Sequence, residues 1–362
     1  MSLKYVFDEF TRHNGYYLPI KIGTPEKSFN VLLDTVTALL WVPGSECGHD
    51  FCDGKAEYSH LLSRTCRTVI PHRRYSFYTY ERQILAYEYD DDITIDQISG
   101  QPLKIINTVF WTPSILRWVD ATRYRLVDGV LGLSSLNIND FLHDNPIHKV
   151  LRSPSTDPII TIALPPRSSY MTPTLTLGAS DDELCSTSDK QVTEKLVSTT
   201  NRYDFAYSSI SIGNTTFSFR WRLAFAYIHT IKPYIAVPDL IMQELILKYD
   251  AKKDPNSNSD MYWVDCKQAF DPFYLRTANN TYVVDPSNFV IKHDYRDRKC
   301  ELAFRTRQGS IGPVVLGIPF LHQYCAILRP NRRSISFRPM NTFHPNVTCY
   351  DSYLRMFSNQ RI

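Results

Sequence analysis

Several features of common protein classes are missing from this chain of 362 residues. Charged residues and proline interrupt even its most apolar region, 223–247, so the chain has no run of about 18 apolar residues, the minimum for a membrane-spanning helix. Residues 1–15 lack the apolar core and small-residue cleavage site of a signal peptide. The formal net charge is only +3, which gives little attraction for nucleic acid or an anionic membrane. We expect neither of these partners.

The length of the chain favours two lobes, because 362 residues exceed what one hydrophobic core usually holds. Hydrophobic residues make up 43% of the sequence and charged residues 21%, as in an ordinary globular protein.

Strand patterns dominate the sequence. Apolar and polar residues alternate between turn signals, as expected of half-buried strands, in the segments 17–23, 74–80, 92–98, 158–164, 174–179, 208–213 and 334–337. Helical patterns are sparse. The clearest predicts a helix that Asp239 caps, with an inward face formed by Leu240, Ile241, Leu245 and Ile246. A shorter helix is predicted around 138–151, and 254–260 is typical of an exposed loop.

An internal repeat relates the two halves of the chain. The segment LLDTVTALLWVP, 32–43, aligns with AYIHTIKPYIAVP, 226–238. The aligned pairs are Asp34 with His229, Thr35 with Thr230, Val36 with Ile231, Val42 with Val237, and Pro43 with Pro238. Each segment is followed by an element of apolar residues and glycine, VDGVLGLSS at 127–135 and PVVLGIPFL at 313–321. Because both order and spacing recur, two similar halves are indicated.

These segments resemble the pepsin-like aspartic peptidases (family A1). In that family the first catalytic segment reads Asp-Thr-Gly-Ser/Thr and then Trp-Val-Pro; here the residues are Asp34-Thr35-Val36-Thr37 and Trp41-Val42-Pro43. The resemblance extends from about residue 15 to 340. It implies a mainly β, bilobal pepsin-like acid-protease fold with a deep interlobe cleft and a few short helices.

The resemblance also implies a division of the chain. We expect an N-terminal lobe at 1–175 with the Asp34 loop and a flap, a C-terminal lobe at 176–345 with the His229 loop, and a tail at 346–362. Tyr80 corresponds to the tyrosine of the family's flap. The flap tip of the family is rich in glycine, whereas residues 81–84 here are Glu, Arg, Gln and Ile. A stiffer or differently shaped flap is predicted, because side chains restrict the backbone.

Four of the eight cysteines match disulfides of the family. Cys47 and Cys52 correspond to a short loop after the first catalytic segment, and Cys266 and Cys300 to a bridge in the C-terminal lobe. The other four, Cys66, Cys185, Cys325 and Cys349, permit three pairings. His49 and Asp50, between Cys47 and Cys52, are possible metal ligands, but the disulfide explains the spacing better. We expect no metal and no cofactor.

Peptide hydrolysis in this family needs two carboxylates that share one proton, since two adjacent like charges cannot both ionise. One carboxylate takes a proton from the attacking water, and the other donates one to the scissile carbonyl oxygen. Asp34 supplies one half, but His229 occupies the second position. An ionised Asp34 beside an imidazole favours the protonated imidazole, and such an ion pair is a poor catalyst.

Further departures affect the same site. Val36 and Ile231 stand where the family has glycine, so β-branched carbon enters a crowded centre. Lys232 and Pro233 replace small hydroxyl residues, and Pro233 has no N–H. Thr35 and Thr230 remain, and the resemblance implies that their hydroxyls brace the two loops across the lobe interface.

We therefore expect an inactive homologue of pepsin-like peptidases, a monomer whose cleft binds a peptide or protein segment without cutting it. One alternative is an active histo-aspartic endopeptidase, with Asp34 as base and protonated His229 as acid. Another is a secreted structural or storage protein on the same scaffold, for which peptide binding would be absent.

The cysteine content favours an oxidising compartment, and sequons at Asn214, Asn279 and Asn346 favour a glycoprotein. A secreted or lysosomal location is thus expected, although residues 1–15 contain no signal peptide.

Overall fold

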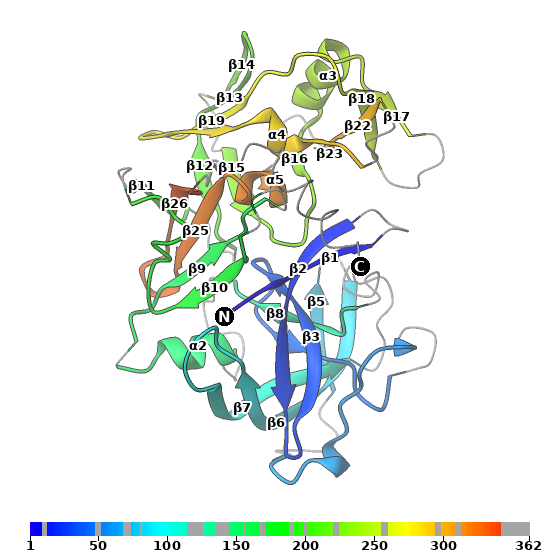
Figure 1. Ribbon diagram of the computed structural model, residues 1–362, viewed down its shortest axis with the longest axis vertical. Coiled ribbons are helices and arrows are strands. Elements are labelled where there is room, and N and C mark those ends of the chain that lie inside the picture. Colours follow the sequence, from blue (N-terminus) through cyan, green and yellow to red (C-terminus); the bar gives the residue numbers. More distant parts are fainter. Residues whose placement is uncertain are drawn as a thin grey trace, which may run out of the picture.

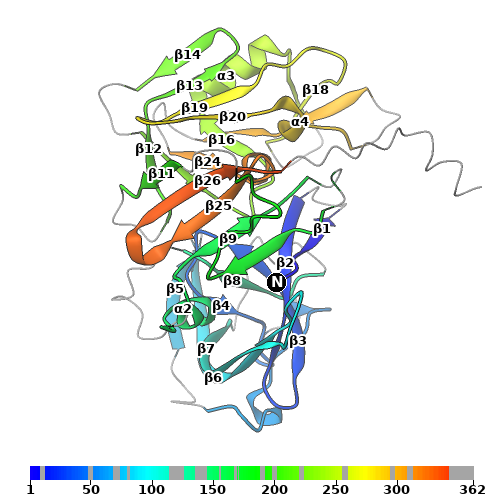
Figure 2. The same ribbon diagram turned by 60° about the vertical axis from the view of Figure 1, so that its left-hand side comes forward.

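The computed structural model describes most of the chain. The described residues are 1–8, 13–47, 52–67, 74–79, 82–113, 126–134, 145–154, 156–166, 169, 171–187, 192–197, 202–219, 224–254, 260–293, 298–307 and 313–341. Strands form most of this part, and the predicted mainly β fold with few short helices is confirmed. Sheets occupy both ends of the elongated molecule and the layer between them (Figures 1 and 2).

The N-terminal half folds into one large twisted sheet, shown in blue and cyan in Figure 1. Its strands, in spatial order, are β1 (Lys4–Asp8), β2 (His13–Ile22), β3 (Lys27–Asp34), β8 (Gly129–Gly132), β4 (Leu40–Trp41), β7 (Leu103–Pro113), β6 (Arg82–Ile95) and β5 (Arg74–Thr79). Strand β2 also pairs with β6, which folds the sheet over its own core.

The C-terminal half is built from three smaller sheets. One contains β12 (Phe205–Tyr207), β15 (Ala224–Ile228), β24 (Val314–Leu316), β16 (Ile235–Pro238) and β23 (Phe304–Arg307). A second contains β14 (Thr215–Ser218), β13 (Ser209–Ile212), β19 (Phe273–Arg276) and β20 (Thr281–Val284). The third contains β17 (Lys252–Lys253), β18 (Tyr262–Asp265), β22 (Lys299–Leu302) and β21 (Val290–Ile291).

A further sheet lies between the two halves in both views (Figures 1 and 2). It contains β10 (Thr174–Leu177), β9 (Ile160–Ala163), β25 (Tyr324–Arg329), β26 (Ser334–Pro339) and β11 (Val192–Lys195). Strands β9 and β25 pair directly although they are far apart in sequence. The start of the chain adds to this layer, because the Leu3 N–H donates to the carbonyl oxygen of Pro173.

The helices are short: α2 (Pro146–Leu151), α3 (Asp239–Lys248), α4 (Pro286–Phe289), α5 (Ile318–Leu321), and the 3-10 turns η1 (His60–Leu62) and η5 (Pro330–Arg332). Among the described residues, none of these helices has the length and apolar character needed to span a bilayer. Helix α2 falls within the predicted segment 138–151, of which 138–144 lie outside the described residues.

Helix α3 confirms the predicted element but not its details. Pro238 is the N-cap and Asp239 is the first helical residue, where its charge favours the positive end of the helix. Leu240 was predicted to face inward, yet it is 54% exposed. Since Ile241 and Leu245 define the buried face, the helical period brings Met242 onto that face and turns Leu240 away.

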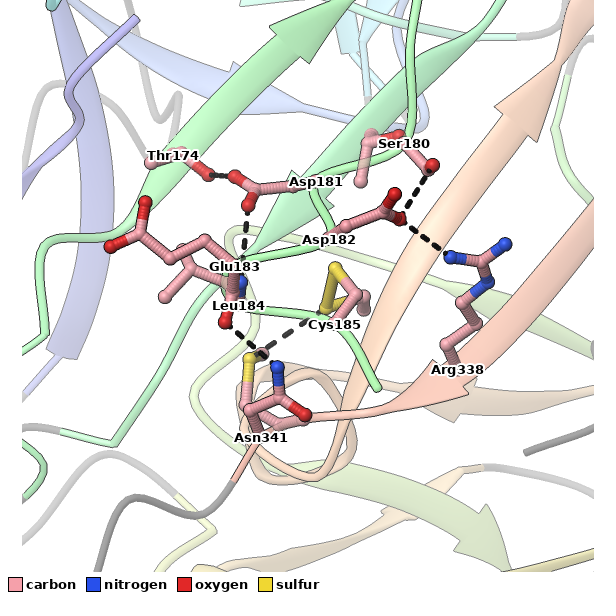
Figure 3. The surroundings of a disulfide bond; sticks show 12 residues. Thr174, Ser180, Asp181, Asp182, Glu183, Leu184, Cys185, Arg338 and Asn341 are labelled. Atoms are coloured by element: carbon pink, nitrogen blue, oxygen red, sulfur yellow. Dashed lines mark hydrogen bonds and ion pairs between the residues drawn. A yellow bond between two sulfur atoms is a disulfide. The ribbon is translucent and has the colours of Figure 1, made fainter. Parts of the chain in front are cut away.

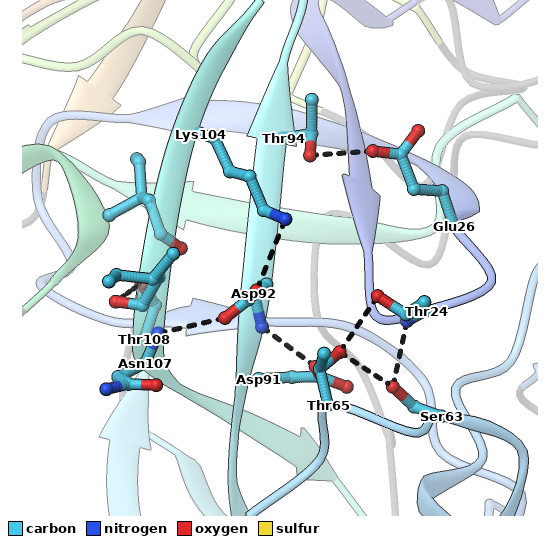
Figure 4. Close-up of polar contacts among 12 residues, drawn as sticks. Thr24, Glu26, Ser63, Thr65, Asp91, Asp92, Thr94, Lys104, Asn107 and Thr108 are labelled. Atoms are coloured by element: carbon cyan, nitrogen blue, oxygen red, sulfur yellow. Dashed lines mark hydrogen bonds and ion pairs between the residues drawn. The ribbon is translucent and has the colours of Figure 1, made fainter.

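A network of hydroxyl groups surrounds the buried carboxylate of Asp91 on β6 (Figure 4). Asp91 accepts hydrogen bonds from the Thr65 hydroxyl at 2.6 Å, the Tyr58 hydroxyl at 2.8 Å and the Asp92 N–H at 2.8 Å. The Thr65 hydroxyl also lies 3.1 Å from the Thr24 hydroxyl, within hydrogen-bond distance. A buried carboxylate requires several hydrogen-bond donors. Because Thr65 supplies one of them, these bonds attach the segment after η1 to the sheet.

Both disulfides that the resemblance implied, Cys47–Cys52 and Cys266–Cys300, are present. Of the remaining cysteines, Cys185 bonds to Cys325. Cys349 lies outside the described residues, and half-buried Cys66 lies beside the Tyr58 hydroxyl.

The Cys185–Cys325 bridge fastens the turn before β11 to β25 (Figure 3). Two aspartates in this turn attach it to neighbouring strands through hydrogen bonds and an ion pair. Asp181 accepts from the Thr174 hydroxyl and the Leu184 N–H, and Asp182 pairs with Arg338 at 2.9 Å. The bridge closes a long stretch of chain across the sheet between the halves, so it restricts the unfolded state strongly.

A contact between the halves involves Tyr16 on β2 and His322 directly after α5. The Tyr16 hydroxyl lies 2.9 Å from His322 Nε2, and the rings meet edge to face. Burial lowers the pKa of His322 to about 4, from an ordinary value of 6.5. The imidazole is therefore neutral near neutral pH.

This pKa predicts an acid-labile contact. The unfolded chain takes up a proton at His322 below about pH 6.5 while the folded chain resists it, so stability falls as pH drops from 6.5 to 4. For this partly exposed ring we expect about 2 kcal/mol of that loss. His322→Gln should flatten the stability curve across this range in urea unfolding measured at several pH values. An unchanged slope in His322→Gln would contradict the assignment.

Candidate functional site

The two loops of the repeat lie together where the halves meet. Asp34 ends β3, which pairs in parallel with β8, and His229 follows β15, which pairs in parallel with β24. In each half a second strand then returns antiparallel to the same partner, β4 beside β8 and β16 beside β24. The repeat in sequence is therefore a repeat in topology, and it places residues 34 and 229 at equivalent points.

Glycines allow the loops to approach their neighbouring strands. A Cβ atom at Gly132 would overlap the carbonyl oxygen of Thr37, and one at Gly317 would overlap the carbonyl oxygens of Lys232 and Tyr234. These glycines belong to the two apolar elements of the repeat. Because they have no side chain, the Asp34 and His229 loops can pack closely against them.

Thr35 and Thr230 join the loops by hydrogen bonds in both directions. The Thr35 hydroxyl donates to the Ile228 carbonyl oxygen at 2.9 Å, and the Thr230 hydroxyl donates to the Leu33 carbonyl oxygen at 2.5 Å. Each hydroxyl also accepts the N–H of the other threonine, at 3.2 and 3.4 Å. Both threonines are buried. The geometry matches the bracing role that the resemblance implies.

Asp34 is fully buried and is held by its own loop. The Val36 N–H donates to Asp34 Oδ1 at 3.0 Å, and the Thr37 hydroxyl donates to Oδ2 at 2.6 Å. Val36 keeps a negative φ, since it is not among the described residues with left-handed backbone. Valine in place of glycine therefore leaves the N–H directed at the carboxylate.

His229 is also buried, but its contacts within its own loop differ from those of Asp34. The Ile231 N–H points at His229 Nδ1 from 3.4 Å, a longer contact than the 3.0 Å bond between the Val36 N–H and Asp34. Lys232 stands where Thr37 stands in the first loop, so the second loop has no hydroxyl at that position.

Asp34 and His229 approach each other without sharing a proton. His229 Nδ1 lies 3.7 Å from Asp34 Oδ1, whereas a charge-assisted hydrogen bond spans about 2.7–2.9 Å. The nitrogen that faces Asp34 is the one that accepts the Ile231 N–H. The two side chains are therefore close, but too far apart to be joined by a hydrogen bond.

The two β-branched residues after the threonines pack reciprocally across the interface. Val36, from the N-terminal loop, contacts the apolar cluster of Tyr227, Ala236 and Val315 in the C-terminal half. Ile231, from the C-terminal loop, is 3% exposed and joins the cluster in the N-terminal half that includes Leu32, Trp41 and Val130. The extra carbon therefore fills the interface between the loops.

Asn145 supports the Asp34 loop and was missed from the sequence. It is buried, its Nδ2 donates to the carbonyl oxygens of Ala38 and Gly132, and its Oδ1 accepts the Ile147 N–H. One side chain thus connects the Asp34 loop, β8 and α2. The only available signal was an asparagine before proline within the segment 138–151, for which a helix was predicted.

The structure describes only some of the residues predicted for the flap and for glycosylation. Strands β5 and β6 pair as a hairpin up to Thr79 and Arg82, as a flap requires, but Tyr80 lies outside the described residues. Asn214 and Asn279 are exposed, in the turns between β13 and β14 and between β19 and β20. Asn346 lies outside the described residues.

Comparison with known proteins identifies the family. A family model with the description "Eukaryotic aspartyl protease" matches residues 15–340. The chain belongs to this family. Aspartic protease 6 of Caenorhabditis elegans is 24% identical to it, over 88% of this chain and 80% of that protein. Renin of Rattus norvegicus is 24% identical, over 89% and 78%. Vacuolar protease A of Neurospora crassa is 22% identical, over 86% and 75%.

As an aspartyl protease homologue, the chain keeps the family's loops but not its pair of acids. The loop connections, the threonine brace and the donors to Asp34 are present. At residue 229 an imidazole occupies the position of the second carboxylate. The site thus differs from the family in the group that would exchange a proton with Asp34, and also at Val36, Ile231 and Lys232.

Proposed function

We propose that this aspartyl protease homologue is catalytically inactive and binds a peptide or protein segment between its lobes without cutting it. One observation carries the proposal: the imidazole of His229 occupies the position of the second carboxylate, with its Nδ1 3.7 Å from Asp34 Oδ1. Hydrolysis needs an acid that donates to the scissile carbonyl oxygen while Asp34 activates water. A buried imidazole that is not hydrogen-bonded to Asp34 does not form the pair of proton-sharing carboxylates on which this chemistry depends.

Retention of the loop architecture supports a binding role. The threonine brace, Asn145 and the two glycines fix the loops independently of proton transfer. The reciprocal packing of Val36 and Ile231 adds apolar contact where the two halves meet. An extended peptide binds such a scaffold through its backbone and side-chain pockets, for which no catalytic pair is required.

A secretory or lysosomal location accompanies this proposal. Three disulfides favour an oxidising compartment. Asn214 and Asn279 are exposed and therefore accessible to glycosylation. One relative carries the word vacuolar in its name.

The test incubates the purified chain with a diverse peptide library between about pH 3 and pH 7, the range in which carboxylates and imidazole titrate. Mass spectrometry should detect no cleavage above that of an Asp34→Asn variant, while peptides from the same library should be retained on the immobilised protein. Specific turnover that Asp34→Asn abolishes would instead establish the active Asp34–His229 peptidase. Absence of both cleavage and retention would favour a structural or storage role.

A further inference from the structure

An aromatic side chain, Tyr227, lies beside the His229 loop and is contacted by two arginines. Its ring is buried, contacts the same cluster as Val36, and has its centroid 6.5 Å from that of His229. The guanidinium carbon of Arg202 lies 4.3 Å from the Tyr227 centroid, and that of Arg307 lies 5.8 Å away. Arg307 also donates to the Tyr227 hydroxyl at 2.9 Å.

The arginines in this region differ in how their charges are balanced. Arg202 pairs with Asp204 at 3.0 Å, and the buried Arg305, which lies over Tyr234, pairs with Glu301 at 2.5 Å. Within the described part of the chain, Arg307 has the neutral Tyr227 hydroxyl and no carboxylate. It is half-buried at the end of β23, so part of its guanidinium faces solvent.

A positioned guanidinium without an anion is suited to bind one. Arginine presents a rigid set of donors that matches a carboxylate, and the Tyr227 hydroxyl uses only one of them. Tyr227 is two residues before His229 and its ring centroid lies 6.5 Å from that of the imidazole, so the hydrogen bond to Tyr227 holds Arg307 near the His229 loop. The positive charge of Arg202 is already balanced by Asp204. The charge of Arg307 therefore stays available for an acidic ligand.

We propose that Arg307, held by Tyr227, recognises a carboxylate of the bound segment. This inference rests on the proposed peptide-binding function and specifies its ligand: a segment with an acidic side chain, or with a free C-terminal carboxylate, next to the residues that lie over Asp34 and His229. A charge-assisted, partly desolvated bond of this kind contributes enough to change affinity by about tenfold.

The test uses fluorescent pools of short random peptides in which one position is fixed as Glu in one pool and as Gln in its matched pool. Each pool is made with a C-terminal carboxylate and with a C-terminal amide. Fluorescence anisotropy on the full chain should show about tenfold tighter binding of either the Glu pool or the free-acid pool, which distinguishes a side chain from a terminus. The preference should weaken as salt is added.

Three variants examine the residue assignment. Arg307→Gln should make the matched pools bind equally, and Tyr227→Phe, which keeps the ring but removes the hydroxyl, should reduce the preference. Arg332→Gln removes the same charge from an exposed site in η5 and should leave it intact. Circular dichroism checks that each variant is folded.

The outcomes separate the two proposals. Binding of all pools without an acid preference, or a preference that survives in Arg307→Gln, refutes the role of Arg307 while peptide binding stands. Binding of no pool refutes the proposed function and this inference with it.

Discussion

Replacing His229 by Asp, with Ile231→Gly and Lys232→Thr, should produce an acid peptidase at least about a hundredfold more active than the unmodified chain. An aspartate at 229 would accept the N–H of residue 231, as Asp34 accepts that of Val36. A threonine at 232 would supply the hydroxyl that Thr37 gives Asp34. Two carboxylates could then share one proton, which requires acidic pH. Cleavage of a quenched fluorescent peptide library measures the gain.

Two further variants control this experiment. Asp34→Asn in the restored background should abolish the gain, because both carboxylates are needed. Adding Val36→Gly should change the rate little, since the Val36 N–H already donates to Asp34. If the unmodified chain cleaves as fast as the restored one, the proposed inactivity is wrong.

Loss of the threonine brace should be the largest single effect on stability. Thr35→Val keeps the shape of the side chain but leaves the Ile228 carbonyl oxygen and the Thr230 N–H without their hydroxyl partner. Thr230→Val does the same to Leu33 and Thr35. Because all of these groups are buried, we expect a loss of about 3 kcal/mol in the free energy of unfolding for each variant. Urea unfolding measures it.

A double-variant cycle distinguishes a brace from two independent contacts. The two substitutions together should cost less than the sum of their separate effects, with a coupling of about 1 kcal/mol or more. Thr108→Val is the matched control, since this buried threonine bonds to Ile105 in its own hairpin and should cost about 1 kcal/mol. Additive effects of Thr35→Val and Thr230→Val would mean that the hydroxyls do not act as one unit.

The fold could be predicted from sequence because its determinants are local or repeated. Period-two alternation of apolar and polar residues predicted strands such as β9 and β13, although the structure buries every residue of both. The pair of Asp34 and His229 was predicted from the repeat, since equal positions in two similar halves come together at the axis that relates them. Helix α3 shows where this approach loses detail: its apolar residues are spread widely, and the pattern wrongly placed Leu240 rather than Met242 on the inward face.

The remaining features depend on contacts between distant segments. Valine and isoleucine after the threonines were expected to disturb the site, but each side chain enters the cluster of the opposite half, which no single segment reveals. Asn145 acts through carbonyl oxygens of Ala38 and Gly132, and backbone groups leave no trace in sequence. The Cys185–Cys325 pairing was one of three arithmetic possibilities until the strands were placed.

The sheet between the halves joins strands from both halves of the chain, so neither half is complete without the other. Strand β9, from the middle of the sequence, pairs with β25, which follows it by more than 150 residues, and the first residues of the chain run along β10. During synthesis β9 therefore has an exposed edge until β25 has emerged. A chain truncated before β25 would keep that edge open and would be prone to association with its copies.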